Sequence, residues 1–115
     1  MRVTIYHNPR CSKSRHTLAL LEQRGLKPEV VEYLQQPPTR QQLKKILKWL
    51  GLKPRDLLRR SEDLYRELNL DDLTLSDEKL ISAMAEYPIL IERPIVLANG
   101  KAAIGRPPEQ VLVIL

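Results

Sequence analysis

Residues 3–33 combine an apolar run, a helical stretch and a second apolar run, and this order permits few folds. Residues 2–6 alternate as a β-strand does, residues 12–24 have the spacing of a helix capped by Gly25, and residues 29–33 are predicted to form a second strand. Strands joined by a helix of this length are parallel, with a right-handed crossover. The loop before the helix therefore lies at the carboxyl end of the first strand, where ligands bind in sheets of this kind.

A helical insertion is predicted between the second and third strands, over about residues 39–90. Thr39 and Gln42 have the spacing of a capping box, and the helix that they open ends at Gly51. Ser76 is predicted to cap a later helix. A short helix between these two is expected to bury three apolar side chains: Leu64, Tyr65 and Leu68.

The last part of the chain returns to β-structure. Asn99-Gly100 lies between two apolar runs, residues 95–98 and 101–104, and predicts a β-hairpin because both turn residues need a positive φ. Residues 109–115 are predicted to form a short amphipathic helix. At 115 residues the chain has room for one modest core. We therefore expect a single α/β domain, with a small mixed four-stranded sheet, flanking helices and the helical insertion.

Cys11 is the single cysteine and lies where the first helix is expected to begin. The free N–H groups and the positive end of the helix dipole favour a thiolate there. A lone cysteine is most often a small buried hydrophobe, but the polar neighbours Arg10, Ser12 and Lys13 fit a core position poorly. We interpret Cys11 as a reactive thiol. Because the chain has no second cysteine, an outside thiol must reduce it after oxidation, and a reducing cytoplasm is the expected location.

The net charge of +5 predicts anionic partners, and much of the excess lies in residues 40–60. A run of charges is usually a solvated helix face, and the few aromatic residues argue against nucleic-acid binding by stacking. No apolar run approaches the ~18 residues of a membrane span, so no membrane contact is expected. His7 and His16 with one cysteine lack the spacing of a zinc site, so no metal is expected.

Residues 5–15 read Ile-Tyr-His-Asn-Pro-x-Cys-x-x-Ser-Arg, and this stretch resembles the glutaredoxin-coupled arsenate reductase family. Further matching blocks follow in the same order, at residues 33–40, 57–59, 88–96 and 106–107. The resemblance covers nearly the whole chain and is closest to the short paralogues of that family. Arg10 departs from the pattern, which has a small residue before the cysteine.

The resemblance implies a thioredoxin-like fold and an oxidoreductase that reduces arsenate to arsenite in arsenic detoxification. Cys11 would attack arsenate, His7 would help to keep Cys11 as a thiolate, and Ser14 would hydrogen-bond near the sulfur. Three arginines would hold the oxyanion: Arg59, Arg93 and Arg106. Guanidinium groups cancel the repulsion between a thiolate and an oxyanion and match its oxygens with paired N–H donors. Spacing alone does not select these three among the eleven arginines of the chain.

The same resemblance implies the source of electrons. Glutathione would act as a co-substrate that releases arsenite, and glutaredoxin would clear the glutathione left on Cys11. No cofactor would be bound to the protein itself. An outside supply of thiols agrees with the single cysteine of the chain.

Two other functions stay open for a thiol protein with these features. One is a related glutathione-dependent thiol oxidoreductase, such as a deglutathionylase, without arsenate specificity. The other is an Spx-like regulator that binds RNA polymerase. The redox switch of such regulators is a Cys-x-x-Cys pair, and position 14 here is serine, which argues against a disulfide switch.

Overall fold

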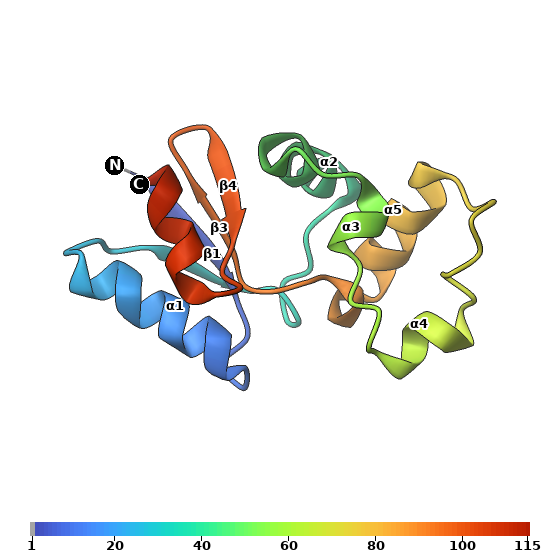
Figure 1. Cartoon of the computed structure of the whole chain (residues 1–115), viewed down its shortest axis with the longest axis horizontal. Coiled ribbons are helices and arrows are strands. Elements are labelled where there is room, and N and C mark those ends of the chain that lie inside the picture. The colour runs from blue at the N-terminus through green and yellow to red at the C-terminus, as the bar shows by residue number, and fades with distance from the viewer. Residues whose placement is uncertain (1) are drawn as a thin grey trace. The chain divides into compact units, whose positions relative to one another are not determined.

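The structure is a computed structural model that describes residues 2–115, and the chain divides into two compact units (Figure 1). The first unit consists of the chain up to Gln36 together with Arg93–Leu115 and holds the β-sheet. The second unit, Pro37–Glu92, is helical and coincides with the insertion predicted over about residues 39–90. Within residues 2–115, no helix combines the length and the apolar character needed to cross a membrane.

A mixed sheet of four strands forms the centre of the first unit. Its elements are β1 (Val3–His7), α1 (Ser12–Gln23), β2 (Glu29–Glu32), β3 (Ile95–Ala98), β4 (Lys101–Ile104) and the 3-10 helix η2 (Pro108–Ile114). The strand order is β2-β1-β3-β4, with β1 and β2 parallel and the other neighbours antiparallel. The predicted βαβ unit and the mixed four-stranded sheet are therefore confirmed.

The predicted hairpin is present, with β3 and β4 at the predicted residues. Asn99 has φ 56° and Gly100 has φ 71°, so both turn residues are left-handed. Ala98 pairs with Lys101 directly across this two-residue turn. The register of the hairpin follows from the turn type, because a two-residue turn of this hand matches the twist of the strands.

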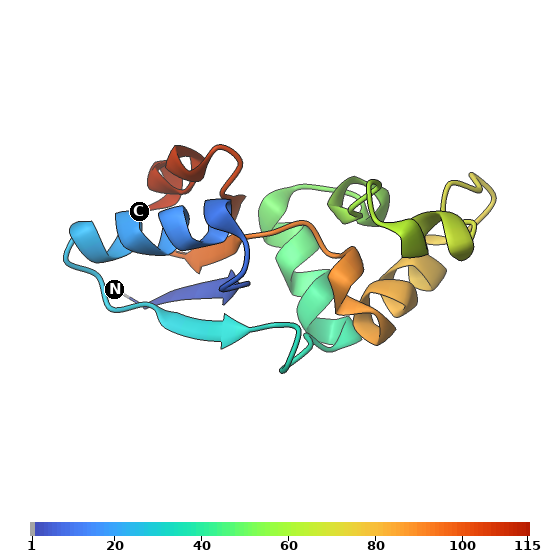
Figure 2. The same ribbon diagram turned by 90° about the horizontal axis from the view of Figure 1, so that it is seen from below.

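Both helices of the first unit cover the same face of the sheet (Figure 2). Alternate residues of β1 and β3 point toward them and pack with apolar residues of the helices. The buried members of this core are Val3, Ile5, Leu21, Val96, Ala98, Val111 and Ile114. The helix predicted over residues 109–115 is present, although it is a 3-10 helix that begins at Pro108. Its buried residues, Pro108, Val111 and Ile114, recur every three positions, which is one turn of such a helix.

The second unit contains four α-helices and a 3-10 helix. They are α2 (Arg40–Leu50), α3 (Pro54–Leu57), α4 (Asp63–Glu67), α5 (Asp77–Glu86) and η1 (Pro88–Leu90). α2 buries Leu43, Ile46 and Leu47, and its polar side is tied to α5 by ion pairs from Arg40 and Lys44 to Glu78. The apolar stripe at helical spacing thus packs inward while the charges link the helices at the surface.

One expected core residue of this unit was assigned wrongly. Leu68 was predicted to be buried, but its side chain is 37% exposed, whereas Leu70 is only 5% exposed. α4 ends at Glu67, and the chain then turns through Asn69, which has a positive φ of 53°. The turn redirects the chain, so that helical spacing no longer applies beyond α4.

Removing the N-cap of α2 is expected to lower the free energy of unfolding by about 1 kcal/mol. Thr39 Oγ1 accepts a hydrogen bond from the Gln42 N–H at 3.1 Å, and Gln42 Oε1 accepts one from the Thr39 N–H at 2.9 Å. Thr39→Ala leaves the first of these donors without its partner. Urea unfolding of Thr39→Ala and of Gln41→Ala, an exposed neighbour on α2, tests this expectation. Equal stability of the two variants would contradict it.

Candidate active site

One end of the sheet gathers three segments that are far apart in sequence. Tyr6 near the end of β1 pairs with Ile95, the first residue of β3, and Ile95 pairs with Ile104 at the end of β4. The loop after β1, the residues before β3 and those after β4 therefore share this end. Three of the residues implied by the resemblance lie there: Cys11, Arg93 and Arg106.

Cys11 is the N-cap residue of α1, as the sequence predicted, and its side chain is half-buried. Its backbone is extended, and its N–H donates to the Asn8 carbonyl at 3.0 Å. The Cys11 side chain makes no capping hydrogen bond, and the first turn of α1 contains no acidic residue. The positive end of the helix dipole therefore faces the thiol without a neutralising carboxylate on that turn.

The loop that carries Cys11 is held by its own hydrogen bonds. Asn8 Oδ1 accepts from the Arg10 N–H at 3.0 Å, and Arg15 Nη1 donates to the Pro9 carbonyl at 2.9 Å. The Arg10 side chain is exposed. The roles of Asn8 and Arg15 in shaping this loop were missed, although the Asn8-Pro9 dipeptide is typical of turn initiation.

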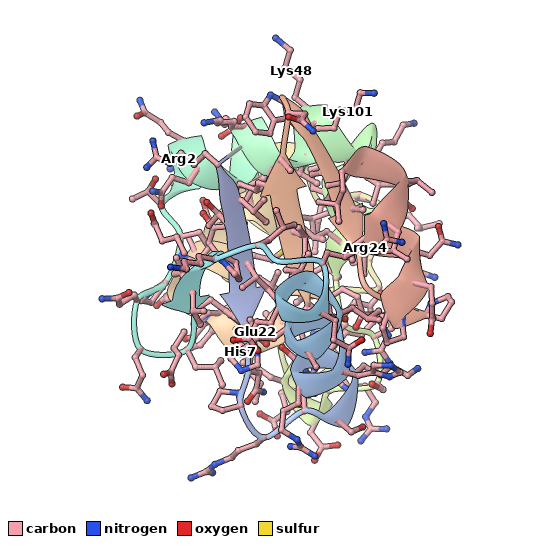
Figure 3. All side chains as sticks on the ribbon, turned by 90° about the vertical axis from the view of Figure 1, so that its left-hand side faces the viewer. Arg2, His7, Glu22, Arg24, Lys48 and Lys101 are labelled. Carbon is pink, nitrogen blue, oxygen red and sulfur yellow. The ribbon has the colours of Figure 1, made fainter. Side chains whose placement is uncertain are left out.

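His7 and Ser14, which flank the Cys11 loop in the sequence, form a buried pair. The His7 Nδ1 and Ser14 Oγ atoms are 2.6 Å apart, and Ser14 Oγ also accepts the Asn8 N–H at 3.0 Å. The side chains are 6% and 0% exposed. β1 runs one residue farther than predicted, so His7 belongs to the strand rather than to the loop. Figure 3 shows His7 at the opposite end of β1 from Arg2.

Burial lowers the pKa of His7 below its usual value; Glu32 opposes this shift and Arg15 adds to it. Two proton arrangements satisfy the His7–Ser14 distance. With a neutral imidazole that is unprotonated at Nδ1, the Ser14 hydroxyl donates to His7. With a proton on Nδ1, His7 donates to Ser14 Oγ, and the hydroxyl hydrogen is then available to another acceptor. Which of the two groups donates therefore depends on which ring nitrogen of His7 carries a proton.

The free energy of unfolding is expected to fall as the pH drops below about 6.5, in part because of His7. Since the folded state lowers the pKa of His7, the unfolded chain binds the proton more readily. Acid therefore favours unfolding until the pH passes the folded-state pKa. Urea unfolding at several pH values should show a weaker pH dependence for His7→Gln than for the wild type. His16→Gln, which changes an exposed histidine of α1, is the matched control, and the same pH dependence in His7→Gln as in this control would contradict the expectation.

A hydrogen bond links Arg93 and Arg106 at this end of the sheet. Arg106 Nη1 donates to the Arg93 carbonyl at 3.3 Å, and the Gly105 N–H donates to the Pro94 carbonyl at 2.9 Å. The peptide bonds from Arg93 and from Arg106 to the prolines that follow them are both cis. Arg93 Nε is buried and has no hydrogen-bond partner among residues 2–115. A buried N–H group without a partner is unusual, and a ligand is one way to satisfy it.

Arg59 lies in the second unit, where two carboxylates flank it. Its Nη1 is 2.7 Å from Glu62 Oε1, and its Nε is 3.6 Å from Glu92 Oε1. The Arg59 N–H donates to the Leu90 carbonyl at 2.7 Å. Glu62 was not singled out from the sequence, although its position three residues after Arg59 is a favourable spacing for an ion pair. Glu92 lies far from Arg59 in the sequence, so no local spacing predicted their proximity.

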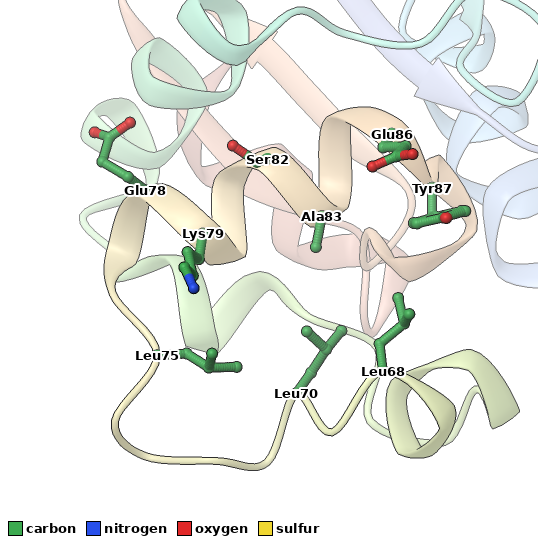
Figure 4. A pocket seen from close by; sticks show the side chains of 9 residues that line it. All are labelled: Leu68, Leu70, Leu75, Glu78, Lys79, Ser82, Ala83, Glu86 and Tyr87. Carbon is green, nitrogen blue, oxygen red and sulfur yellow. The ribbon is translucent and has the colours of Figure 1, made fainter.

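A separate pocket of the second unit contains none of the predicted site residues. It has a volume of about 430 Å³ and lies between α5 and the segment of residues 68–75 (Figure 4). Leu68, Leu70 and Tyr87 form part of its apolar lining. Among residues 2–115, no group of three histidine, cysteine or acidic side chains is placed to hold a metal ion.

The model of the ArsC family matches residues 6–114. This chain belongs to the ArsC family. It is 61% identical over 115 residues to the Escherichia coli K12 protein YfgD, with 99% of this chain and 97% of that protein covered. It is 54% identical over 114 residues to the arsenate reductase of Neisseria meningitidis serogroup A, with 98% and 97% covered.

Solved structures of ArsC relatives share the fold. The structure of arsenate reductase from Vibrio cholerae has a TM-score of 0.98 and 59% identity, and the match covers 100% of this chain and 98% of that one. The four-stranded mixed sheet with its helical insertion is thus the predicted thioredoxin-like α/β fold of this ArsC member.

Proposed function

We propose that this protein reduces arsenate to arsenite, with Cys11 as the nucleophile and with glutathione and glutaredoxin supplying the electrons. The observation that carries the proposal is the buried, unpartnered Arg93 Nε at the same sheet end as the thiol at the start of α1. A guanidinium donor at the same end of the sheet as a thiol suits a substrate that is an oxyanion and is attacked by sulfur. Membership of a family with relatives named arsenate reductases supports arsenate as that oxyanion.

Arg93 and Arg106 would bind the substrate oxygens and offset its negative charge as the Cys11 thiolate approaches. The same groups would stabilise the charge that develops as an oxygen leaves arsenic. Arg59 would be the third ligand. Because Glu62 and Glu92 flank the Arg59 guanidinium, an oxyanion would have to compete with two carboxylates for it. Such competition would favour substrates that carry more than one negative charge.

His7 and Ser14 would manage the proton of the thiol. With a proton on Nδ1 of His7, the Ser14 hydroxyl would be free to donate a hydrogen bond toward the sulfur of Cys11, which lies three residues before Ser14. This bond would stabilise the thiolate. A neutral His7 can also hold its proton on Nδ1, so this arrangement does not require the imidazolium, which the lowered pKa of His7 disfavours. We propose that the pair relays a proton between the site and His7 rather than holding a permanent charge beside Cys11.

The reaction would transfer two electrons in balanced steps. The Cys11 thiolate forms a bond to arsenic, and an oxygen of arsenate leaves as water after protonation. Glutathione would then attack this adduct, and the sulfur–arsenic bond would break with its electron pair on arsenic. Arsenic would leave as arsenite, and the two sulfurs would remain joined as a mixed disulfide. Glutaredoxin with a second glutathione reduces this disulfide and restores Cys11. The absence of a second cysteine in the chain makes an outside thiol necessary for this last step.

A coupled assay tests the proposal. Arsenate-dependent NADPH consumption is measured with the purified protein, glutathione, glutaredoxin and glutathione reductase, and each component is then omitted in turn. We expect turnover that requires arsenate, glutathione and glutaredoxin together. Turnover without glutaredoxin would remove that partner from the proposal. A protein that reduces a glutathione mixed disulfide but leaves arsenate unchanged would instead be a thiol oxidoreductase without arsenate specificity.

A further inference from the structure

Gly105 lies where three segments of the first unit meet, and no side chain fits there. A Cβ atom on Gly105 would be 2.5 Å from Thr17 Oγ1 and 2.8 Å from Pro94 Cγ. Gly105 is not among the residues with a positive φ, so its backbone conformation does not call for glycine. The requirement is one of space, because the atoms nearest to the added Cβ belong to the buried side chains of Thr17 and Pro94, which have little room to move aside in a closely packed interior.

Each of the three segments carries a residue of the proposed site. Thr17 belongs to α1, six residues after Cys11 and three after Ser14. Its side chain is fully buried, and its Oγ1 donates to the Lys13 carbonyl at 2.8 Å. Gly105 directly precedes Arg106, and its own N–H donates to the Pro94 carbonyl at 2.9 Å.

We propose that Gly105 is a positioning residue whose missing side chain sets the distance between the Cys11 sulfur and the oxyanion held by the two arginines of the first unit. This inference rests on the proposed function. α1 approaches the Gly105 backbone directly through Thr17, and this contact would fix how far the start of α1, with Cys11, lies from the segments that carry Arg93 and Arg106. Sulfur attack requires the reacting atoms to come within about 3–3.5 Å, so a small outward shift of α1 would be costly.

Gly105→Ala is expected to lower kcat/KM for arsenate by about 10–100-fold, because a misplacement of about 1 Å can cost about 100-fold. The double variant Gly105→Ala/Thr17→Ala should recover a large part of this loss, since it removes both Thr17 atoms nearest to the added methyl group. Thr17→Ala alone gives the baseline for the comparison. Failure of the double variant to recover activity would overturn the inference.

A matched control distinguishes activity lost through lower stability from activity lost through a displaced Cys11. Thr39→Ala weakens α2 in the second unit, whereas Gly105 belongs to the first unit, so it reports what destabilisation alone does to kcat/KM. If Gly105→Ala loses no more activity than Thr39→Ala, the inference is wrong. If Gly105→Ala does not fold, the double variant carries the test. A folded, active double variant supports the close-contact account, and a double variant that also fails to fold overturns it.

A second readout does not depend on arsenate turnover. The ratio of Cys11 alkylation rates with iodoacetate, an anion, and iodoacetamide, which is neutral, reports the positive field of the arginines at the sulfur. Gly105→Ala should lower this ratio, and the double variant should restore it. A wild type without arsenate turnover that shows this pattern would refute the proposed substrate while upholding the positioning role. Arsenate turnover in the wild type, with an unchanged ratio in Gly105→Ala, would refute the positioning role alone.

Discussion

Arsenate-dependent NADPH consumption by Cys11→Ser is expected to fall to the background of the coupled assay, a loss of at least about 1,000-fold. A serine hydroxyl is not ionised near neutral pH and is a far weaker nucleophile than a thiolate. In addition, an oxygen at this position cannot become part of a mixed disulfide, so the route by which two electrons reach arsenic is closed.

The control for this variant is Ser12→Ala, which changes an exposed residue of the first turn of α1. It should keep turnover within about two-fold of the wild type, since exposed substitutions away from packed features have small effects. Thermal unfolding of Cys11→Ser should match the wild type closely, because the Cys11 side chain is only half-buried and makes no capping bond. Turnover in Cys11→Ser within ten-fold of the wild type would exclude Cys11 as the nucleophile.

Arg106→Ala is expected to lower kcat/KM for arsenate by about 100–1,000-fold, which is the usual effect of removing one preorganised donor from a developing anion. Both kcat and KM should change, because Arg106 is proposed to contact the oxyanion in the bound state and in the transition state. Arg106→Lys keeps the charge but loses the planar fork of N–H donors, so it should recover only part of the activity.

Arg24→Ala is the matched control for Arg106→Ala. Arg24 is the C-cap residue of α1, at the other end of the helix from Cys11, and its replacement removes the same unit of charge. Activity within about two-fold of the wild type is expected for Arg24→Ala, because a change in net charge acts mainly on distant steering, which salt screens. If Arg106→Ala were no worse than Arg24→Ala, Arg106 would not be an oxyanion ligand.

The elements that the sequence predicted correctly depend on contacts between near neighbours in the chain. The Asn99-Gly100 turn, the Thr39 capping box and the Ser76 cap each involve residues within three positions of one another. The βαβ unit follows from the order and length of three consecutive elements. Local sequence was insufficient to predict the turn after α4. This five-residue helix offers too few positions to show its buried side, and Leu70 rather than Leu68 is the core residue.

Some features of the candidate site could likewise be predicted from local sequence, and others could not. Cys11 at the start of a helix could be recognised from its own neighbours, and the resemblance selected His7, Ser14 and three of the eleven arginines. The sequence did not indicate that His7 would be buried against Ser14, nor that Arg93 Nε would be left without a protein partner. It also did not indicate the carboxylates around Arg59 or the contact between Thr17 and Gly105.

By itself, then, the sequence determined the order of the elements, their turns and caps, and the position of the thiol at a helix start. Only the tertiary structure decided which arginine donor is buried, which proton partner His7 has and why position 105 must be glycine. The physical reason is the distance along the chain. Thr17 and Gly105 meet because strand register and helix packing bring them together, and those depend on the whole core rather than on any local pattern of residues.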